Sequence, residues 1–350
     1  MIGTRRTKPL TMLPLAVTMG DPAGIGPDII VAAWHQRTAQ HLPPFVVYGD
    51  PAVLASRAHA LGIQVAVTPI QCPSQESRLA AAALPVVDTG SAGPVTPGAG
   101  STHGAAATLA AIDRAVADVL ADKAAGLVTA PITKSVLYEA GFRHPGHTEY
   151  LAHRANAANP GHHFHPVMML ACGQLKVVPA TIHIPLRDVP AALTQDLLTR
   201  TIMITDQALK RDFRIPMPRI AVTGLNPHAG EQGTLGTEDR DIIAPVIAAL
   251  QAQGLHVTGP HSADTLFHAA ARRRYDAALA MYHDQALIPI KTLAFDEGVN
   301  VTLGLPFVRT SPDHGTAYDI AASGRADPQS FIAALKLAAL MAQNRTSPAV

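Results

Sequence analysis

The chain has 350 residues, of which 48% are hydrophobic and 15% charged, so a large buried core is expected, and a disordered chain or coiled coil is excluded. Its 27 Lys and Arg residues balance 26 Asp and Glu residues, which argues against a nucleic-acid-binding surface, and no apolar run is long enough to span a membrane. The two cysteines, Cys72 and Cys172, exclude a disulfide scaffold and a thiolate zinc finger, and such low usage is typical of a cytoplasmic protein.

The N-terminus combines a basic segment with an apolar run. Residues 5–8 carry three positive charges and precede the run Leu10–Val17, as in a secretory signal peptide. No small-residue cleavage site follows, and the run leads instead into a Gly/Pro loop at Gly20. We therefore expect a short disordered leader, residues 1–12, followed by a buried strand.

Short β-branched runs alternate with Ala-rich stretches along most of the chain. The expected strands are Leu13–Met19, Phe45–Tyr48, Ile63–Thr68, Leu127–Thr129, Val167–Leu170, Lys176–Thr181, Ile220–Thr223 and Ala277–Met281. The expected helices include Thr108–Ala121, Leu193–Lys210, Asp239–Gln253 and Gln329–Met341. Several strands are apolar throughout, which indicates burial on both faces, so the sequence predicts an α/β protein with largely parallel sheets. In such folds the active site forms beyond the carboxyl ends of the strands.

The common catalytic and nucleotide-binding motifs are absent from the sequence. It contains no GxGxxG fingerprint, no GxxxxGK[ST] phosphate loop, no GxSxG elbow and no HExxH. The nearest candidate, Gly20–Gly26, has glycines at the wrong spacing. A dinucleotide would therefore have to bind by a geometry other than the Rossmann fingerprint.

Three histidines follow the ends of three different expected strands: His183, His228 and His283. Neutral imidazoles that leave coordination positions open are typical of a catalytic divalent-metal site. Their wide separation in the sequence matches no local metal-binding motif, so spacing alone favours three unrelated histidines. Asp284, directly after His283, could ligate a metal or orient an imidazole.

Two further groups of residues suit an anion. His147 and Thr148 precede a helix expected near Tyr150, and the free N–H groups of a helix N-terminus attract negative charge. The alternative is that Thr148 is only an N-cap. Lys291, Asn300 and Arg309 lie near the ends of the late strands, where a Lys and an Arg together could clamp a phosphate. Any one of these residues alone is more often a surface residue.

Nine segments, in the same order, resemble the 4-hydroxythreonine-4-phosphate dehydrogenase family of vitamin B6 biosynthesis. They are Thr18–Asp28, Thr129–Lys134, Gly146–Glu149, Thr181–Leu186, Leu225–Glu231, Ala263–Phe267, Met281–Gln285, Val299–Ser311 and Asp313–Thr316. The resemblance covers nearly the whole chain. The sequence departs from the family at Gln232 and Ala286, where the family commonly has glycine.

This resemblance implies two α/β/α lobes of the isocitrate/isopropylmalate dehydrogenase type, with the active site in the cleft between them. Residues 13–130 and 305–350 would form the first lobe. Residues 131–304 would form the second lobe, with the metal ligands and the interface of a homodimer. That fold binds NAD without a Rossmann fingerprint, which agrees with the absence of GxGxxG.

The resemblance also implies roles for the candidate residues. The ligands of one divalent metal (zinc, cobalt, manganese or magnesium) would be His183, His228 and His283, with His283 reaching in from the partner subunit. The substrate-binding residues would be His147, Thr148, Lys291, Asn300 and Arg309. The candidate catalytic residues would be Asp264, Asp284 and Lys291.

The implied reaction is the oxidation of 4-phosphooxy-L-threonine at C3 by NAD or NADP. Decarboxylation to 3-amino-2-oxopropyl phosphate would follow. One alternative is a paralogous dehydrogenase for another hydroxy acid, such as a four-carbon sugar-acid phosphate or an aromatic dihydrodiol carboxylate. A more remote alternative is a non-catalytic metal- or phosphate-binding protein. In each case we expect a small-molecule ligand, a cytoplasmic location and no nucleic-acid or membrane partner.

Overall fold

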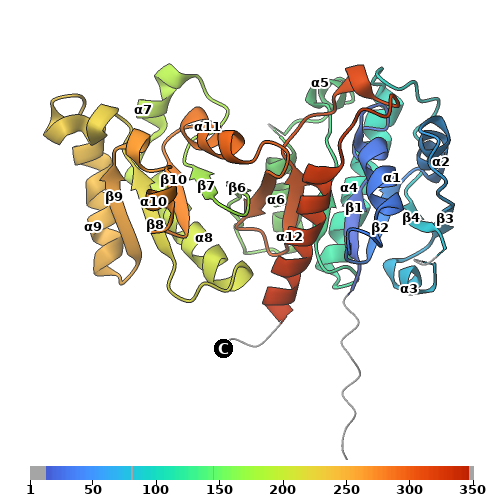
Figure 1. Ribbon diagram of the computed structural model, residues 1–350, viewed down its shortest axis with the longest axis horizontal. Coiled ribbons are helices and arrows are strands. Elements are labelled where there is room, and N and C mark those ends of the chain that lie inside the picture. Colours follow the sequence, from blue (N-terminus) through green and yellow to red (C-terminus); the bar gives the residue numbers. More distant parts are fainter. Residues whose placement is uncertain (1–12, 80–81, 145, 347–350) are drawn as a thin grey trace, which may run out of the picture.

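A computed structural model describes residues 13–79, 82–144 and 146–346 (Figure 1). The predicted disordered leader, residues 1–12, lies outside this described part. The described strands form one 12-stranded sheet in the order β3-β4-β2-β1-β5-β12-β11-β6-β7-β10-β8-β9. The strand bounds are β1 (Leu15–Thr18), β2 (Phe45–Gly49), β3 (Val67–Ile70), β4 (Leu84–Asp88), β5 (Leu127–Thr129), β6 (Val167–Ala171), β7 (Lys176–Pro179), β8 (Arg219–Thr223), β9 (His256–His261), β10 (Ala277–Ala280), β11 (Val299–Leu303) and β12 (Arg309–Pro312).

Helices connect most of these strands. The α-helices are α1 (Gly26–His35), α2 (Pro51–Ala60), α3 (Glu76–Leu79), α4 (Thr102–Leu120), α5 (Lys134–Glu139), α6 (His147–Ala158), α7 (Val189–Ala192), α8 (Gln195–Asp212), α9 (Ala244–Ala252), α10 (Ala269–Arg272), α11 (His283–Leu293) and α12 (Gln329–Thr346). Short 3₁₀ or π turns are η1 (Pro73–Gln75), η2 (Leu186–Asp188), η3 (Pro227–Gly233), η4 (Asp239–Ile243), η5 (Ala263–Thr265) and η6 (Tyr318–Ile320). In the described part of the chain, no helix has the length and apolarity needed to cross a bilayer.

The α/β prediction with largely parallel strands is confirmed. Pairs at both ends of the sheet are parallel, and the antiparallel pairs are the central ones, β12 with β11, β11 with β6, and β6 with β7. Every expected strand is present, although the third is Val67–Ile70 rather than Ile63–Thr68. Strands β4, β9, β11 and β12 were not among the expected strands, and the helix expected from Thr108 begins already at Thr102.

Both faces of the sheet are buried, as the uniformly apolar strands predict. In β1, Leu15 and Val17 face one hydrophobic core while Ala16 faces the other, because successive strand residues point to opposite sides. Helices α1, α2, α8, α9 and α12 cover the first face, and α4, α6 and α11 cover the second. Full burial of each large aliphatic side chain contributes about 1.5–3 kcal/mol, so these two cores hold the sheet rigid.

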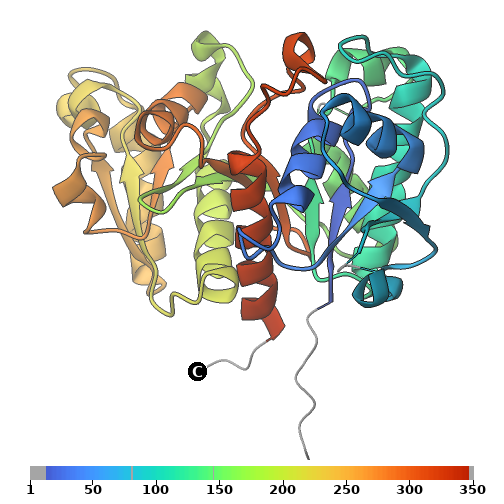
Figure 2. The same cartoon turned by 45° about the vertical axis from the view of Figure 1, so that its right-hand side comes forward.

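Helix α12 lies in the middle of the molecule. Figures 1 and 2 show it between the end of the sheet that carries β9 and α9 and the end that carries β3 and α2. It packs on β12 and β11 and also touches α8 and α1. The sheet itself runs without interruption through β5, β12, β11 and β6. The division into two lobes with boundaries near residues 131 and 305 stays a prediction.

Candidate active site

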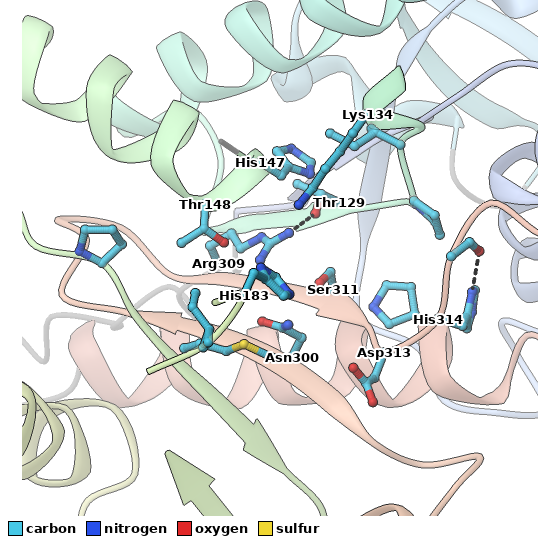
Figure 3. Close-up of a pocket in the computed structure, with 18 of the residues that line it drawn as sticks. Thr129, Lys134, His147, Thr148, His183, Asn300, Arg309, Ser311, Asp313 and His314 are labelled. Atoms are coloured by element: carbon cyan, nitrogen blue, oxygen red, sulfur yellow. Dashed lines mark hydrogen bonds between the residues drawn. The ribbon is translucent and has the colours of Figure 1, made fainter. Parts of the chain in front are cut away.

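A cavity of about 500 Å³ lies over the central antiparallel strands. Its floor includes Asn300 of β11 and Arg309 and Ser311 of β12. Asn300 is paired with Ser311 in the ladder, and Arg309 lies two residues before Ser311, so all three side chains point to the same face. The walls come from the loops after β5, β7 and β10 and from the start of α6 (Figure 3).

The cavity brings together residues that are far apart in the sequence. The predicted site residues that line it are His147, Thr148, His183, His283, Lys291, Asn300 and Arg309. Asp264 and Asp284, both exposed, line a shallower groove beside it together with Tyr282. His228 lies outside this cavity, on the exposed turn η3.

Arg309 is the buried cation of the site. Its side chain is only 4% exposed, and it donates to Thr129 Oγ1 at 2.7 Å and to Thr302 Oγ1 at 2.9 Å. Its Nε has no partner among the described residues. Burial lowers the pKa of Arg309 to about 10, so the group still carries its charge at neutral pH. A buried guanidinium that is bound only by hydroxyl groups is costly unless an anion joins it.

His147 opens α6 beside Arg309. Burial, assisted by the charge of Arg309, holds the pKa of His147 well below its usual value, so the ring is neutral at physiological pH. Its Nε2 is buried and has no partner in the described part of the chain. The N-cap of α6 is Gly146, which has no side chain to accept from the first N–H groups of the helix. These groups are therefore available to an anionic ligand.

Lys291 reaches the cavity from α11. Its Nζ lies 2.7 Å from Asp313 Oδ2 and 5.4 Å from the ring centroid of Phe295. Lys291 is therefore already held in place by a carboxylate in the described structure. This ion pair sets Lys291 apart from Arg309, which has no carboxylate partner among the described residues.

His183 and His283 stand next to each other at the cavity wall. Their ring centroids are 5.7 Å apart. Partial desolvation lowers the pKa of His183, and the charges of Lys134 and His283 act in the same direction, although the residue is accessible to solvent. Nδ1 of His283 lies 2.7 Å from Asp284 Oδ1, which leaves Nε2 free to bind a ligand. A carboxylate behind an imidazole is the arrangement that orients metal-binding histidines.

His228 has a similar carboxylate partner but a different location. Its Nδ1 lies 2.8 Å from Glu231 Oε1, and this hydrogen bond, together with the charge of Glu231, raises the pKa of His228. Five successive residues, His228 to Gln232, have positive φ angles, and only Gly230 among them is a glycine. Such left-handed backbone is strained and is typical of functional loops.

Asp239 holds this strained turn in place. Its carboxylate accepts from the backbone N–H of Leu225 at 2.8 Å and of Asn226 at 3.1 Å, and from Asn226 Nδ2 at 2.9 Å. The buried carboxylate thus satisfies the backbone at the entry to the turn. The surrounding structure determines the conformation of the loop that carries His228.

The three predicted metal ligands do not meet within one chain. In the residues that the structure describes, no group of three His, Cys, Asp or Glu side chains is arranged to hold a metal ion. Within one chain His183 and His283 lie side by side, and His228 does not line the cavity that they share. The metal site shared between two copies stays a prediction.

Six other polar residues line the cavity without having been assigned a role from the sequence. They are Thr129, Lys134, Glu149, Ser311, Asp313 and His314. All six fall within the segments that carry the family resemblance. Except for Glu149, which lies on α6, they lie at the end of β5 or after it, or within or after β12. This position is the signal that could have identified them, because ligand sites form at such strand ends.

Comparisons with known proteins agree with the resemblance. The family model for pyridoxal phosphate biosynthetic protein PdxA matches residues 40–338. A 4-hydroxythreonine-4-phosphate dehydrogenase from Bradyrhizobium diazoefficiens is 53% identical over 95% of this chain and 98% of its own length.

Solved structures point the same way. The crystal structure of 4-hydroxythreonine-4-phosphate dehydrogenase from Klebsiella pneumoniae is similar with a TM-score of 0.85 and 39% identity, over 96% of this chain and all of that chain. A terephthalate 1,2-cis-dihydrodiol dehydrogenase from Burkholderia xenovorans shares the fold with a TM-score of 0.63 and 29% identity, over 94% of this chain and 98% of its own. The family model and the relatives cover nearly the whole chain, and the chain belongs to the family of pyridoxal phosphate biosynthetic protein PdxA.

Proposed function

We propose that this chain oxidises 4-hydroxythreonine 4-phosphate with NAD and a divalent metal, as a step of pyridoxal phosphate biosynthesis. Relatives that are named for this activity match this chain over nearly their whole length. The observation that carries the proposal is Arg309, a buried cation that faces the cavity and has no carboxylate partner among the described residues. A substrate phosphate would supply the missing negative charge.

Phosphate recognition follows from the chain's own groups. The guanidinium of Arg309 and the N-terminus of α6 both present N–H donors to the same cavity, and the neutral His147 adds its unpartnered Nε2. Thr148 and Asn300 add polar groups that can orient the rest of the substrate. Binding energy from the phosphate, which takes no part in the reaction, then holds the reacting carbon in position.

The imidazole side chains of these histidines are of the type that binds a divalent metal. His183 and His283 share a cavity wall, and the rings of His228 and His283 each contact a carboxylate through Nδ1, which leaves Nε2 available. Imidazole ligands favour zinc, cobalt or manganese over magnesium. A metal held by these residues would polarise the C3 hydroxyl of the substrate, and NAD would accept the hydride from C3.

A complete set of three histidines requires two copies of the chain. The family resemblance implies that His283 comes from the partner subunit. The pairing of His183 with His283 in one chain instead supports His228 as the ligand that comes from the second copy. Exposed apolar side chains surround this pair, with Leu186 67% and Ile288 63% exposed, as expected for a surface that a second copy covers.

The rim of the cavity offers room for the nicotinamide cofactor. His314 and Gly315 line it, and Nε2 of His314 is buried without a partner in the described chain. A Cβ atom added at Gly315 would meet nothing within 4 Å, so a ligand can approach the backbone there. Such a site needs no Rossmann fingerprint.

The remaining polar residues provide positioning and proton transfer. Asp284 orients His283 through its hydrogen bond, and Asp264 lies in the same groove, so both stay candidates for taking the proton of the C3 hydroxyl. Lys291, held by Asp313, contacts the substrate from α11. Oxidation at C3 gives a β-keto acid, which loses its carboxyl group as CO₂.

A substrate panel tests the proposal. The purified chain would be assayed for NADH formation with 4-hydroxythreonine 4-phosphate, unphosphorylated 4-hydroxythreonine, a four-carbon sugar-acid phosphate and an aromatic dihydrodiol carboxylate. We expect the first compound to give the highest kcat/KM, and we expect chelation to abolish turnover until a divalent metal is added back. Preference for another member of the panel, or full activity in metal-free protein, would contradict the proposal.

A further inference from the structure

Lys134 lies in the candidate site, and its side chain has no hydrogen bond or ion pair with the described residues. It is the first residue of α5, its side chain is exposed, and it lines the cavity. Figure 3 shows the side chain extending into the cavity toward Thr129 and His147. Among the described residues its ammonium group forms no ion pair, whereas Lys291 is paired with Asp313.

The ammonium group of Lys134 lies against the N-terminus of α6. A Cβ atom added at Gly146, the N-cap of this helix, would lie 3.5 Å from Lys134 Nζ and 2.7 Å from Glu149 Oε2. The positive end of a helix dipole repels a cation, so this placement is unfavourable unless an anion lies between them. Glu149 supplies one negative charge there.

A second cation of the cavity is Arg309, which is 4% exposed and whose Nε has no partner among the described residues. Two carboxylates line the described cavity, Glu149 and Asp313, and Asp313 already pairs with Lys291. Lys134, Arg309 and the α6 N-terminus therefore concentrate positive charge that Glu149 offsets only in part. This excess matches a dianion better than a neutral ligand.

We propose that Lys134 is a phosphate-binding residue, whose ammonium group closes on the phosphate that Arg309 and the N-terminus of α6 hold. The inference rests on the proposed function for the identity of the phosphorylated substrate. Because Lys134 is exposed and unpaired in the described structure, it can move onto the phosphate without breaking another ion pair. Lys291, in contrast, would have to share its ammonium group with Asp313.

Calorimetric titration of the intact chain with inorganic phosphate tests this role without turnover. The proteins compared are wild type, Lys134→Met, Lys134→Arg and a control, Lys336→Met, which removes an exposed lysine of α12 that does not line the cavity. We expect Lys134→Met to weaken phosphate binding about tenfold, because it removes one charge-assisted hydrogen bond, and Lys134→Arg to retain most of the affinity. Lys336→Met should bind as wild type does, and each variant's Tm reports whether it is folded.

Kinetics separates this proposal from the proposed function. In Lys134→Met the ratio of kcat/KM for the phosphorylated substrate to that for unphosphorylated 4-hydroxythreonine should fall about tenfold, since only the former has the group that Lys134 binds. If the wild type oxidises the phosphorylated substrate while Lys134→Met keeps wild-type phosphate affinity, the role of Lys134 is rejected and the function stands. If phosphate binding falls in the variant but the wild type oxidises no phosphorylated substrate, the phosphate site stands and the function fails.

Discussion

At the scale of single residues, the site is defined by the positive charge of Arg309, which has no direct carboxylate partner among the described residues. Arg309 is buried against the hydroxyl groups of Thr129 and Thr302, an environment that desolvates the guanidinium without pairing it. Stability alone does not explain such a residue, because an unpaired buried cation opposes folding. The proposed negatively charged ligand would explain its position.

Replacing this cation should separate activity from stability. We expect Arg309→Met to lower kcat/KM for the phosphorylated substrate by about 100-fold or more, because a buried charge-assisted contact to phosphate is lost. Its Tm should equal or exceed that of the wild type, since the desolvated charge is removed and an apolar chain fills the space. If both Tm and activity fell by a large amount, Arg309 would serve the fold rather than the ligand.

The buried carboxylate of Asp212, unlike the guanidinium of Arg309, is paired with groups of opposite charge. Asp212 at the end of α8 is fully buried, and its carboxylate accepts two hydrogen bonds from Arg345 of α12 and two from Arg211. Burial acts to raise the pKa of Asp212, but these four hydrogen bonds outweigh it and hold the pKa below its usual value. A lowered pKa contributes stability that is present above the unfolded-state value of about 3.9 and is lost as the pH falls through the folded-state value.

The pair thus predicts a pH-dependent effect of Asp212→Asn. At pH 7 the variant should lose about 3–5 kcal/mol of unfolding free energy, because the partly buried Arg345 is left without its carboxylate. As the pH falls below about 4 toward the lowered folded-state pKa, the wild type progressively loses this contribution, so the difference in Tm between the two proteins should shrink. Thermal unfolding at pH 7 and at pH 3.5 measures this, and a difference that does not change with pH would contradict the linkage.

At the scale of elements, the sequence predicts those whose patterns are local. The strands on either side of the central region were expected because they are short, β-branched and apolar on both faces. Strands β3 and β9 were misplaced or missed because each contains a proline, Pro69 or Pro260, which normally argues against a strand. Both lie at the two ends of the sheet, where a missing N–H costs no ladder hydrogen bond.

The start of α4 is a second feature that the sequence does not predict correctly. The helix begins at Thr102 rather than at Thr108, where the sequence predicts its start, and its first turn includes Gly104. The Oγ of Ser101 accepts from the N–H of Gly104 at 3.1 Å and so caps the helix. Packing of α4 against β1 and β2 then extends it through residues of low intrinsic helix propensity.

The left-handed turn η3 gives a prediction of its own. Gln232 has φ of 60° where the family resemblance expects glycine. Gln232→Val should lower the free energy of unfolding by about 1–2 kcal/mol, because a β-branched side chain is strongly disfavoured at positive φ. Gln232→Gly should leave it unchanged or raise it, and chemical denaturation of both variants provides the comparison. Equal effects of the two substitutions would show that the turn is not strained at this position.

At the scale of the whole molecule, the candidate site is where the sequence is least informative. Residues from β5, β11, β12, α6 and α11 converge on one cavity, and no spacing rule connects them, because the distances depend on the order of the strands. The resemblance identified seven of the residues that line this cavity, but it did not identify Lys134 or Asp313. Nor could it show that His183 and His283 pair within one chain, since their ring separation depends on the packing of α11 against β7 and β10.

This pairing leads to a test of which histidine crosses the dimer interface. If one site consists of His183 and His283 of one chain and His228 of the second, a heterodimer of His183→Ala and His228→Ala has both lesions in one site and none in the other. Random mixing makes about half of the dimers heterodimers, so about a quarter of wild-type activity should return. A heterodimer of His183→Ala and His283→Ala has one lesion in each site and should stay inactive.

The mixture of His183→Ala with His228→Ala and the mixture of His183→Ala with His283→Ala give opposite results, depending on which histidine comes from the partner subunit. If His283 comes from the partner subunit, mixing His183→Ala with His283→Ala restores activity, and mixing His183→Ala with His228→Ala does not. The control is His228→Ala mixed with His283→Ala, which should recover activity under either assignment and so demonstrates that subunits have exchanged. No recovery in any of the three mixtures, with exchange confirmed by mass spectrometry of tagged chains, would reject a site shared between two copies.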